Sequence, residues 1–492
     1  MSRTSPLPSS RGHWIILAGF FLVALFAYIW ANGFPFFYHR DEESKALQLL
    51  YGYRNFWHPM LMLSATKLIA HLTGADGDSQ AITVVGRCLS ATFSAVGVAA
   101  FVHLAWRRQG MGAAVLTGFF LLILPLLFDV SHYCKEDPAL FMGFAFTLLA
   151  FDCFWERPDK RRVLLAGLAA GVATSAKYPG ALLILAGIVV VLLRTKETSS
   201  RLQFLLAAFA TVLAINWEWL FHMGELSLGV QRESAMLAAG HDGVASHLPH
   251  GRYWLILLWQ LGWGMLVAAL AGMFLSRMPG QLISKERVLG ATALLLLVLM
   301  SFSPKVSERY LLPFMAAFCY LAACGVIHMV CFLPRFRTPA TFLLVALVSA
   351  HPLMLLGEYV RDFSHDSRAE MSAWTKSHFK KHDRLATSLW TRLPGFYQGQ
   401  YIVGVAPADY VADLGTVAQL KEMGYTWVAV ADVESARFED AQQTGTSTSE
   451  SAFQHRRTFY EDLRSQADLR WSAPKGTVYN LHPGLKLYQL RP

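Results

Sequence analysis

Long apolar runs separated by short polar segments fill the first 357 residues of the chain. Eleven runs are found, at residues 14–32, 81–106, 112–128, 138–154, 163–175, 180–193, 202–221, 253–275, 288–302, 310–332 and 339–356. A helix of about 20 apolar residues crosses a hydrocarbon core about 30 Å thick, and a helix satisfies backbone polar groups that have no water partner there. The pattern therefore predicts a polytopic α-helical membrane protein of about eleven transmembrane helices.

Two of the segments between these runs are long enough to carry structure of their own. Residues 33–80 contain helical patterns at Glu43–Tyr51 and Met60–Leu72, and the second presents an apolar face typical of a helix lying on the membrane surface. Residues 222–252 form a second long segment that is rich in histidine. Long loops that face a helical bundle are where a site can be built.

Residues 358–492 have a different pattern. Helical periodicity and strand-like runs alternate there, with a Gln/Thr/Ser-rich loop at residues 440–451. The expected helices are Asp366–Lys381, Thr416–Met423 and Ser451–Ala467, and the expected strands are Tyr425–Ala431 and Leu485–Leu490. We therefore predict a membrane domain over residues 1–357 and a small soluble α/β domain over residues 358–492.

The charges support this division and indicate an orientation. The chain is 54% hydrophobic and 16% charged, whereas soluble domains carry about 25% charged residues. The net charge of +9 lies entirely in residues 1–357, because the last 135 residues balance sixteen basic with sixteen acidic side chains. Lys and Arg are enriched in the loops that share a side with the N-terminus. The bias predicts a cytoplasmic N-terminus and an extracytoplasmic C-terminal domain rather than a nucleic-acid-binding surface.

Ionisable residues gather at the predicted outer ends of the helices. They occur in four groups, namely His39-Arg40-Asp41-Glu42-Glu43, His132-Tyr133-Cys134-Lys135-Glu136-Asp137, Lys177-Tyr178 and Lys305 with Glu308-Arg309-Tyr310. Charges at a membrane boundary are costly and therefore indicate function. A carboxylate can accept a proton from a hydroxyl, and Lys or Arg can hold a phosphate, so the set suits transfer of a group from a lipid phosphate to a hydroxyl.

Each group also has a structural interpretation. The acids Asp41 to Glu43 could cap the helix that begins there, and Asp137 before Pro138 fits a helix N-cap. Lys177 and Arg309 could anchor helix ends at lipid head groups. The six cysteines all lie in the membrane part, and neither they nor the histidines have the spacing of a metal site.

The order of these motifs resembles the GT-C superfamily of polyprenyl-phosphate-sugar-dependent glycosyltransferases. Within it the chain resembles glycosyltransferase family 39 and the lipopolysaccharide-core glycosyltransferases, which are related to protein O-mannosyltransferases. The resemblance is carried by His39-Arg40-Asp41-Glu42, His58-Pro59, His132 to Pro138, Ala176 to Gly180, Glu308 to Pro313 and, in the C-terminal part, Asp366 to Trp374 and Tyr425 to Val430. It covers nearly the whole chain.

The resemblance implies an inverting transfer of a sugar at the outer face of a bacterial plasma (inner) membrane. By this match Asp41 is the catalytic base and Glu42 supports it. Asp137, with Glu136 and His132, belongs to a second acidic motif on the acceptor side. Lys177 and Arg309, with Lys135 and Tyr178, bind the donor phosphate. Arg40 stands where relatives often have Pro, and its charge could weaken Asp41 as a base, which leaves Glu42 as the alternative base.

The expected partners are a polyprenyl-phosphate sugar, a glycan, lipid or protein acceptor and the lipid bilayer. No nucleotide-binding signature occurs. A divalent cation, Mg²⁺ or Mn²⁺, is left open, because paired acids can hold one. Two other functions are left open: a transporter or flippase for lipid-linked sugars, which would need related halves and polar residues through the depth of its spans, and a sensor or scaffold.

Overall fold

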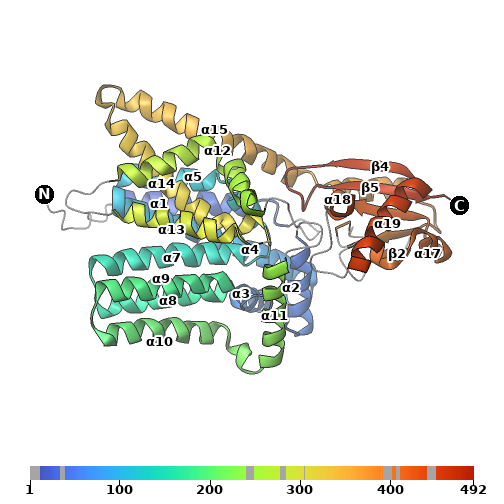
Figure 1. Ribbon diagram of the computed structural model, residues 1–492, viewed down its shortest axis with the longest axis horizontal. Helices are drawn as coiled ribbons and strands as arrows, with labels where there is room; N and C mark the ends of the chain where they lie inside the picture. The colour runs from blue at the N-terminus through green and yellow to red at the C-terminus, as the bar shows by residue number, and fades with distance from the viewer. Residues whose placement is uncertain are drawn as a thin grey trace.

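The protein has two parts, a bundle of long helices and a small α/β domain next to one end of it (Figure 1). The computed structural model describes residues 11–33, 39–239, 249–276, 284–303, 305–388, 390–391, 402–405, 410–439 and 450–491. In the picture the bundle axis runs horizontally, and the α/β domain lies beyond one end of the bundle. The expected fold class, a helical membrane protein with a C-terminal α/β domain, is confirmed.

Every predicted apolar run coincides with helix in the structure. The corresponding elements are α1 (Arg11–Ile29), α4 (Ser79–Gln109), α5 (Met111–Leu122) with α6 (Pro125–Ser131), α7 (Asp137–Glu156), α8 (Lys160–Ala176), α9 (Ala181–Arg194), α10 (Thr198–Ile215), α12 (Pro249–Leu275), α13 (Lys285–Met300), α14 (Leu312–Cys331) and α15 (Arg337–Ser364). Seven segments of the described chain are long and apolar enough to cross a membrane, or eight if α5 and α6, which meet at 61°, count as one span. The helices α8, α9 and α13 are shorter, at 17, 14 and 16 residues.

Glycines allow the helices to pack closely where backbones meet. A Cβ on Gly325 of α14 would lie 1.9 Å from the carbonyl oxygen of Ala268 in α12, and a Cβ on Gly272 of α12 would lie 1.9 Å from that of Leu321. Small residues are typical of helix contacts in membranes, because packing rather than apolar burial drives association there. The α12–α14 pair therefore depends on both glycines.

The two long segments between the predicted spans contain helices at the bundle end that faces the α/β domain (Figure 1). Residues 33–80 contain α2 (Arg40–Tyr51) and α3 (Leu61–Thr73), close to the two predicted helices. Residues 222–252 contain α11 (Met223–Ala239), while the predicted His-rich part with His241 and His247 lies outside the described residues.

The C-terminal domain is a five-stranded mixed sheet covered by helices. Its strand order is β2-β1-β3-β5-β4, with β1, β2 and β3 parallel and β5 antiparallel to both β3 and β4. The strands are β1 (Arg384–Thr387), β2 (Ile402–Val405), β3 (Trp427–Ala431), β4 (Ala467–Lys475) and β5 (Pro483–Leu490), and the helices are α16 (Ser367–His378), α17 (Val417–Glu422), α18 (Asp432–Glu439) and α19 (Glu450–Gln466). All five residues of β3 are buried, as expected for the central strand.

The sequence pattern found part of this domain. The expected helices correspond to α16, α17 and α19, and the expected strands correspond to β3 and β5, whereas β1, β2, β4 and α18 were not predicted. Most of the predicted loop at residues 440–451 lies outside the described residues. The predicted boundary at residue 357 falls inside α15, which continues to Ser364.

Candidate active site

The charged groups at the helix ends near the α/β domain meet beside α2 (Figure 1). Asp41 and Lys45 lie one turn apart on this helix and therefore share a face. The short segment between α6 and α7 brings Lys135 and Glu136, and α7 begins with Asp137. Lys177 follows the end of α8, and Arg309 lies in the 3₁₀ turn (Glu308–Leu311) that leads into α14. These residues, far apart in the sequence, form a network of ion pairs.

Asp41 forms an ion pair with Lys135, whose side chain is 2% exposed. Burial alone would raise the pKa of Asp41, but the surrounding positive charge, above all that of Lys135, holds this pKa well below its ordinary value. Burial, with the nearby charge of Arg309, lowers the pKa of Lys135 to about 7. Asp41 is therefore ionised at neutral pH, and Lys135 is close to losing its proton.

Asp137 lies between two cations. Its Oδ1 is 2.6 Å from Nζ of Lys177, and its Oδ2 is 3.9 Å from Nε of Arg309. Lys177 is buried and its Nζ also lies 4.7 Å above the ring of Tyr310. The structural alternatives for these two residues are not supported. Lys177 is 6% exposed and pairs with Asp137, and the N-cap of α7 is Glu136, so Asp137 is the first residue of the helix.

Glu136 links the network to Lys45 and His58. Its Oε1 is 3.0 Å from Nζ of Lys45, and its Oε2, which is buried without a hydrogen-bond partner, is 3.9 Å from Nε2 of His58. Burial would raise the pKa of Glu136, but His58 and the neighbouring lysines lower it. Burial lowers the pKa of His58 to about 4, so this ring is neutral at pH 7.

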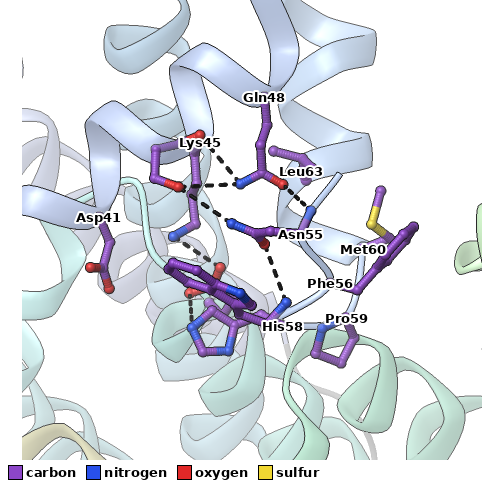
Figure 2. A pocket seen from close by; sticks show the side chains of 12 residues that line it. Asp41, Lys45, Gln48, Asn55, Phe56, His58, Pro59, Met60 and Leu63 are labelled. Carbon is purple, nitrogen blue, oxygen red and sulfur yellow. Dashed lines mark hydrogen bonds and ion pairs between the residues drawn. The ribbon is translucent and has the colours of Figure 1, made fainter. Parts of the chain in front are cut away.

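Glu136, Lys45 and His58 line a pocket with Asp41 at its edge (Figure 2). The pocket encloses about 450 Å³, open solvent included. Its other walls are amide, hydroxyl, aromatic and apolar side chains, namely Ser44, Gln48, Asn55, Phe56, Trp57, Pro59, Met60 and Leu63. Such a mixture of a few polar groups with aromatic walls is typical of sites for small molecules.

Glu42 points away from this pocket and holds the site together. Its carboxylate accepts hydrogen bonds from Arg87 of α4 at 3.0 and 2.9 Å and from the backbone N–H of Cys134 at 2.8 Å. It also accepts the N–H of His39 at 3.2 Å, which completes a capping box at the start of α2. The side chains of Glu42 and Arg87 are both fully buried. Because the Glu42 carboxylate is already bound by these groups, Asp41 is the better candidate for a base.

His132 and Tyr178 also have structural contacts. His132 is buried between the rings of Phe128 and Phe363, at 4.4 and 4.5 Å, and its Nδ1 lies 2.7 Å from the carbonyl oxygen of Phe128. Tyr178 donates its hydroxyl to the carbonyl of Phe56 at 2.8 Å. The structure thus brings Asp41, Lys135, Glu136, Asp137, Lys177 and Arg309 together, while His132 and Tyr178 support the surrounding backbone.

Sequence reasoning missed two residues of this network, Lys45 and Arg87. Lys45 could have been found from its i+4 spacing to Asp41, and Arg87 from being a charge inside a predicted span. His58 was singled out only as part of a motif. The side chain of Arg40, which could affect Asp41, lies outside the described residues; among the described side chains Lys135 forms the ion pair with Asp41.

The acids of this site are arranged for pairing with cations rather than for holding a metal. In the part of the chain that the structure describes, no three His, Cys, Asp or Glu side chains are grouped as a metal site requires. Asp41, Glu136 and Asp137 each face a lysine. The donor set therefore does not fit Mg²⁺ or Mn²⁺, which take several oxygen ligands, and it favours binding of an anion between Lys177 and Arg309.

Comparisons with known proteins bear on the family and on the fold. Residues 58–219 match the family described as dolichyl-phosphate-mannose-protein mannosyltransferase. No curated protein matches the sequence significantly. The fold is similar to that of ArnT from Cupriavidus metallidurans bound to undecaprenyl phosphate, with a TM-score of 0.57 and 13% identity over 97% of this chain and 98% of that chain.

A second similar structure is the archaeal oligosaccharyltransferase AglB from Archaeoglobus fulgidus, in complex with an inhibitory peptide and a dolichol-phosphate. Its TM-score is 0.51, with 12% identity over 86% of this chain and 69% of that chain. The family match covers α3 to α10, and the shared fold extends along nearly the whole chain. The protein thus has the fold of the GT-C glycosyltransferases, and its residues 58–219 match a family of protein mannosyltransferases.

Proposed function

We propose that this protein is an inverting glycosyltransferase that moves a sugar from a polyprenyl-phosphate donor to a hydroxyl acceptor at the outer face of a bacterial plasma membrane. The observation that carries the proposal is the convergence of Asp41, Asp137, Lys177 and Arg309 from four separate elements. The reaction needs a base for the acceptor hydroxyl and cations for the donor phosphate. Asp41 beside the pocket can be the base, and Lys177 and Arg309, which share Asp137, can be the cations.

In the proposed reaction Asp41 takes the proton of the acceptor hydroxyl. The acceptor oxygen forms a bond to the anomeric carbon of the sugar, and the bond between this carbon and the phosphate oxygen breaks with inversion. The released polyprenyl phosphate leaves with the extra negative charge. Lys177 and Arg309 stabilise that charge, because a phosphate can compete with Asp137 for both cations.

The remaining charged residues have supporting roles in this proposal. Lys135 pairs with Asp41 and keeps it ionised until the acceptor binds. Glu136 and Lys45 hold opposite charges on the pocket wall and can bind hydroxyl groups of the acceptor or of the transferred sugar.

The proposed donor and side of the membrane are supported by the position of the site. The network lies at the bundle end next to the α/β domain, where a lipid can approach from the bilayer and an acceptor from water (Figure 1). Undecaprenyl phosphate is bound in the similar ArnT structure. The acceptor belongs to the hydroxyl-bearing envelope molecules, namely glycolipids, lipopolysaccharide and proteins.

Replacing Asp41 tests this function. In full-length protein reconstituted with a labelled polyprenyl-phosphate sugar and cell-envelope acceptors, Asp41→Asn should lower the transfer rate by about 10²–10⁴-fold, the contribution of a general base. The matched control is Asp76→Asn, an exposed carboxylate of the same outer segment paired with His71. Equal transfer by Asp41→Asn and Asp76→Asn would refute Asp41 as the base. Movement of labelled lipid across the bilayer without transfer would instead support a flippase.

A further inference from the structure

The segment of residues 55–60, between α2 and α3, has a backbone shape that other elements must hold. All six of its residues line the pocket (Figure 2). Phe56 is 1% exposed and has a φ of +48°, in the left-handed region. This conformation is costly for a bulky side chain and persists only where neighbouring contacts stabilise it. The shape of this side of the pocket therefore depends on contacts from outside the segment.

One such contact comes from Asn216, which follows α10 and is fully buried. Its Oδ1 accepts the backbone N–H of Met60 at 2.7 Å. Its Nδ2 donates to Oγ of Ser175 in α8 at 3.0 Å and to the carbonyl oxygen of Val212 at 2.8 Å. The opposite orientation of the amide would set N–H against N–H and oxygen against oxygen, so the orientation is fixed. Asn216 therefore joins the 55–60 segment to the end of α8.

A second contact comes from Tyr178, three residues after Ser175. Its hydroxyl donates to the carbonyl oxygen of Phe56 at 2.8 Å. Its ring is stacked with that of Trp219, with centroids 6.3 Å apart. Tyr178 thus binds the segment at the residue with positive φ, whereas Asn216 binds it at its last residue.

Lys177 lies between these two attachment points in the chain. Ser175 precedes it and Tyr178 follows it, so the backbone that carries Lys177 is attached to the 55–60 segment on both sides. The Lys177 side chain pairs with Asp137, at 2.6 Å. The separation between this cation and the pocket is therefore fixed by hydrogen bonds of its neighbours. A misplacement of about 1 Å in a reacting site can lower the rate about 10²-fold.

We propose that Asn216 is a positioning residue of the transfer site, and that it sets, with Tyr178, the separation between Lys177 and the pocket. This inference rests on the proposed function of the same site. In that reaction Lys177 holds the phosphate side of the breaking bond, and the pocket holds the sugar or the acceptor. Asn216 and Tyr178 act through the backbone, by keeping the two sides at the separation that the transition state requires.

The proposal predicts a loss of kcat without a loss of affinity for the phosphate. In the reconstituted full-length protein, Asn216→Ala and Tyr178→Phe should each lower kcat about tenfold, the scale of a lost buried hydrogen bond. Binding of undecaprenyl phosphate, which carries no sugar, should stay within about twofold of the wild type, because Lys177 and its partner Asp137 are unchanged. A residue that contacts the phosphate itself would lower both.

The matched control is Thr174→Ala. Thr174 lies next to Ser175 in α8, but its hydroxyl donates to the carbonyl oxygen of Ala170 in the same helix, at 2.9 Å, so kcat should be unchanged.

Ser175→Ala tests the link from the other side, because it removes the acceptor of the Asn216 amide. It should lower kcat by no more than Asn216→Ala does. The double variant should lose no more than about twofold beyond Asn216→Ala, because both changes remove the same link. If Asn216→Ala does not fold, Ser175→Ala and Tyr178→Phe, each of which lacks one oxygen atom, decide the same question.

Two results would overturn the positioning role. One is a wild-type kcat in Asn216→Ala, or in Ser175→Ala and Tyr178→Phe, with at most a lower melting temperature. The other is an equal loss of kcat and of affinity for undecaprenyl phosphate, which would place Asn216 in the phosphate site. A wild-type protein that transfers no sugar would instead refute the proposed function, and this role with it.

Discussion

At the scale of single residues, the site is defined by how each carboxylate is neutralised. Asp41, Glu136 and Asp137 each pair with a lysine that is less than 10% exposed. A buried charge without a partner is costly, so each pair is stable only while both members are present. Binding of a phosphate between Lys177 and Arg309 must therefore rearrange at least one pair.

The Asp41–Lys135 pair predicts how activity depends on pH. The pKa of Lys135 is lowered to about 7, so its proton is lost as the pH rises through about 7. Loss of this charge removes the main group that lowers the pKa of Asp41, which makes Asp41 a stronger base. We expect kcat/KM, which reports the free enzyme, to rise with pH through about 7.

The control for this pH profile is Lys135→Arg, because arginine keeps its charge across this range. This variant should give a kcat/KM that is low and flat near neutral pH. A wild-type profile without a rise in this range, or the same rise in Lys135→Arg, would contradict the assignment to Lys135.

At the scale of elements, α2 is the part that the site depends on most. Its isolated sequence is short and polar, and a helix of 12 residues is only marginally stable without tertiary contacts. The capping box at His39 and the ion pair of Glu42 with Arg87 attach it to α4, and Glu42 also binds the segment before α7. One buried carboxylate therefore joins three elements around Asp41.

This arrangement predicts a stability effect of Glu42. Glu42→Leu should lower the free energy of unfolding by about 3–5 kcal/mol, because it leaves Arg87 buried without its partner. The double variant Glu42→Leu/Arg87→Met should recover part of that loss, since an apolar pair needs no neutralisation. Thermal unfolding in detergent, followed by the loss of monodisperse protein, measures both effects. A single variant as stable as the wild type would contradict the structural role of this ion pair.

At the scale of the whole molecule, the site lies at one end of the bundle and a second cluster of charges lies at the other. Asp152, at the end of α7, forms ion pairs with Arg108 of α4 and Lys285 of α13 at 3.0 and 2.6 Å. The start of α1 is also at this end, because the ring of His13 stacks on that of Trp106 in α4, with centroids 3.8 Å apart. This end lies opposite the α/β domain (Figure 1). If the basic end faces the cytoplasm, the site and the α/β domain face outward.

Cysteine labelling tests this orientation. Cys331, at the end of α14 away from the site, is exposed, whereas Cys134, Cys319 and Cys324 are buried. A maleimide that does not cross membranes should label Cys331 only after the cells are permeabilised. Arg470→Cys on β4 of the α/β domain should react in intact cells once the outer membrane, where present, is opened. The reverse pattern would place the site on the cytoplasmic side.

The sequence by itself determined the helices and the identity of the charged groups. A run of about 20 apolar residues has few alternatives to a helix in a membrane, which is why every predicted run coincides with helix. Charged residues at the edge of a membrane are costly, so they stand out beside the apolar runs of the sequence. Asp41, Asp137, Lys177 and Arg309 were found in this way.

Only the tertiary structure decided which charges meet. Asp41 and Glu42 are neighbours in sequence but have different partners, Lys135 and Arg87. The reason is that successive residues of a helix point about 100° apart. Arg309 and His39 lie 270 positions apart in the sequence, yet their side chains meet at 3.0 Å. The short strands β1 and β2 depend on pairing rather than on periodicity. Local patterns set the elements, and long-range packing set the site.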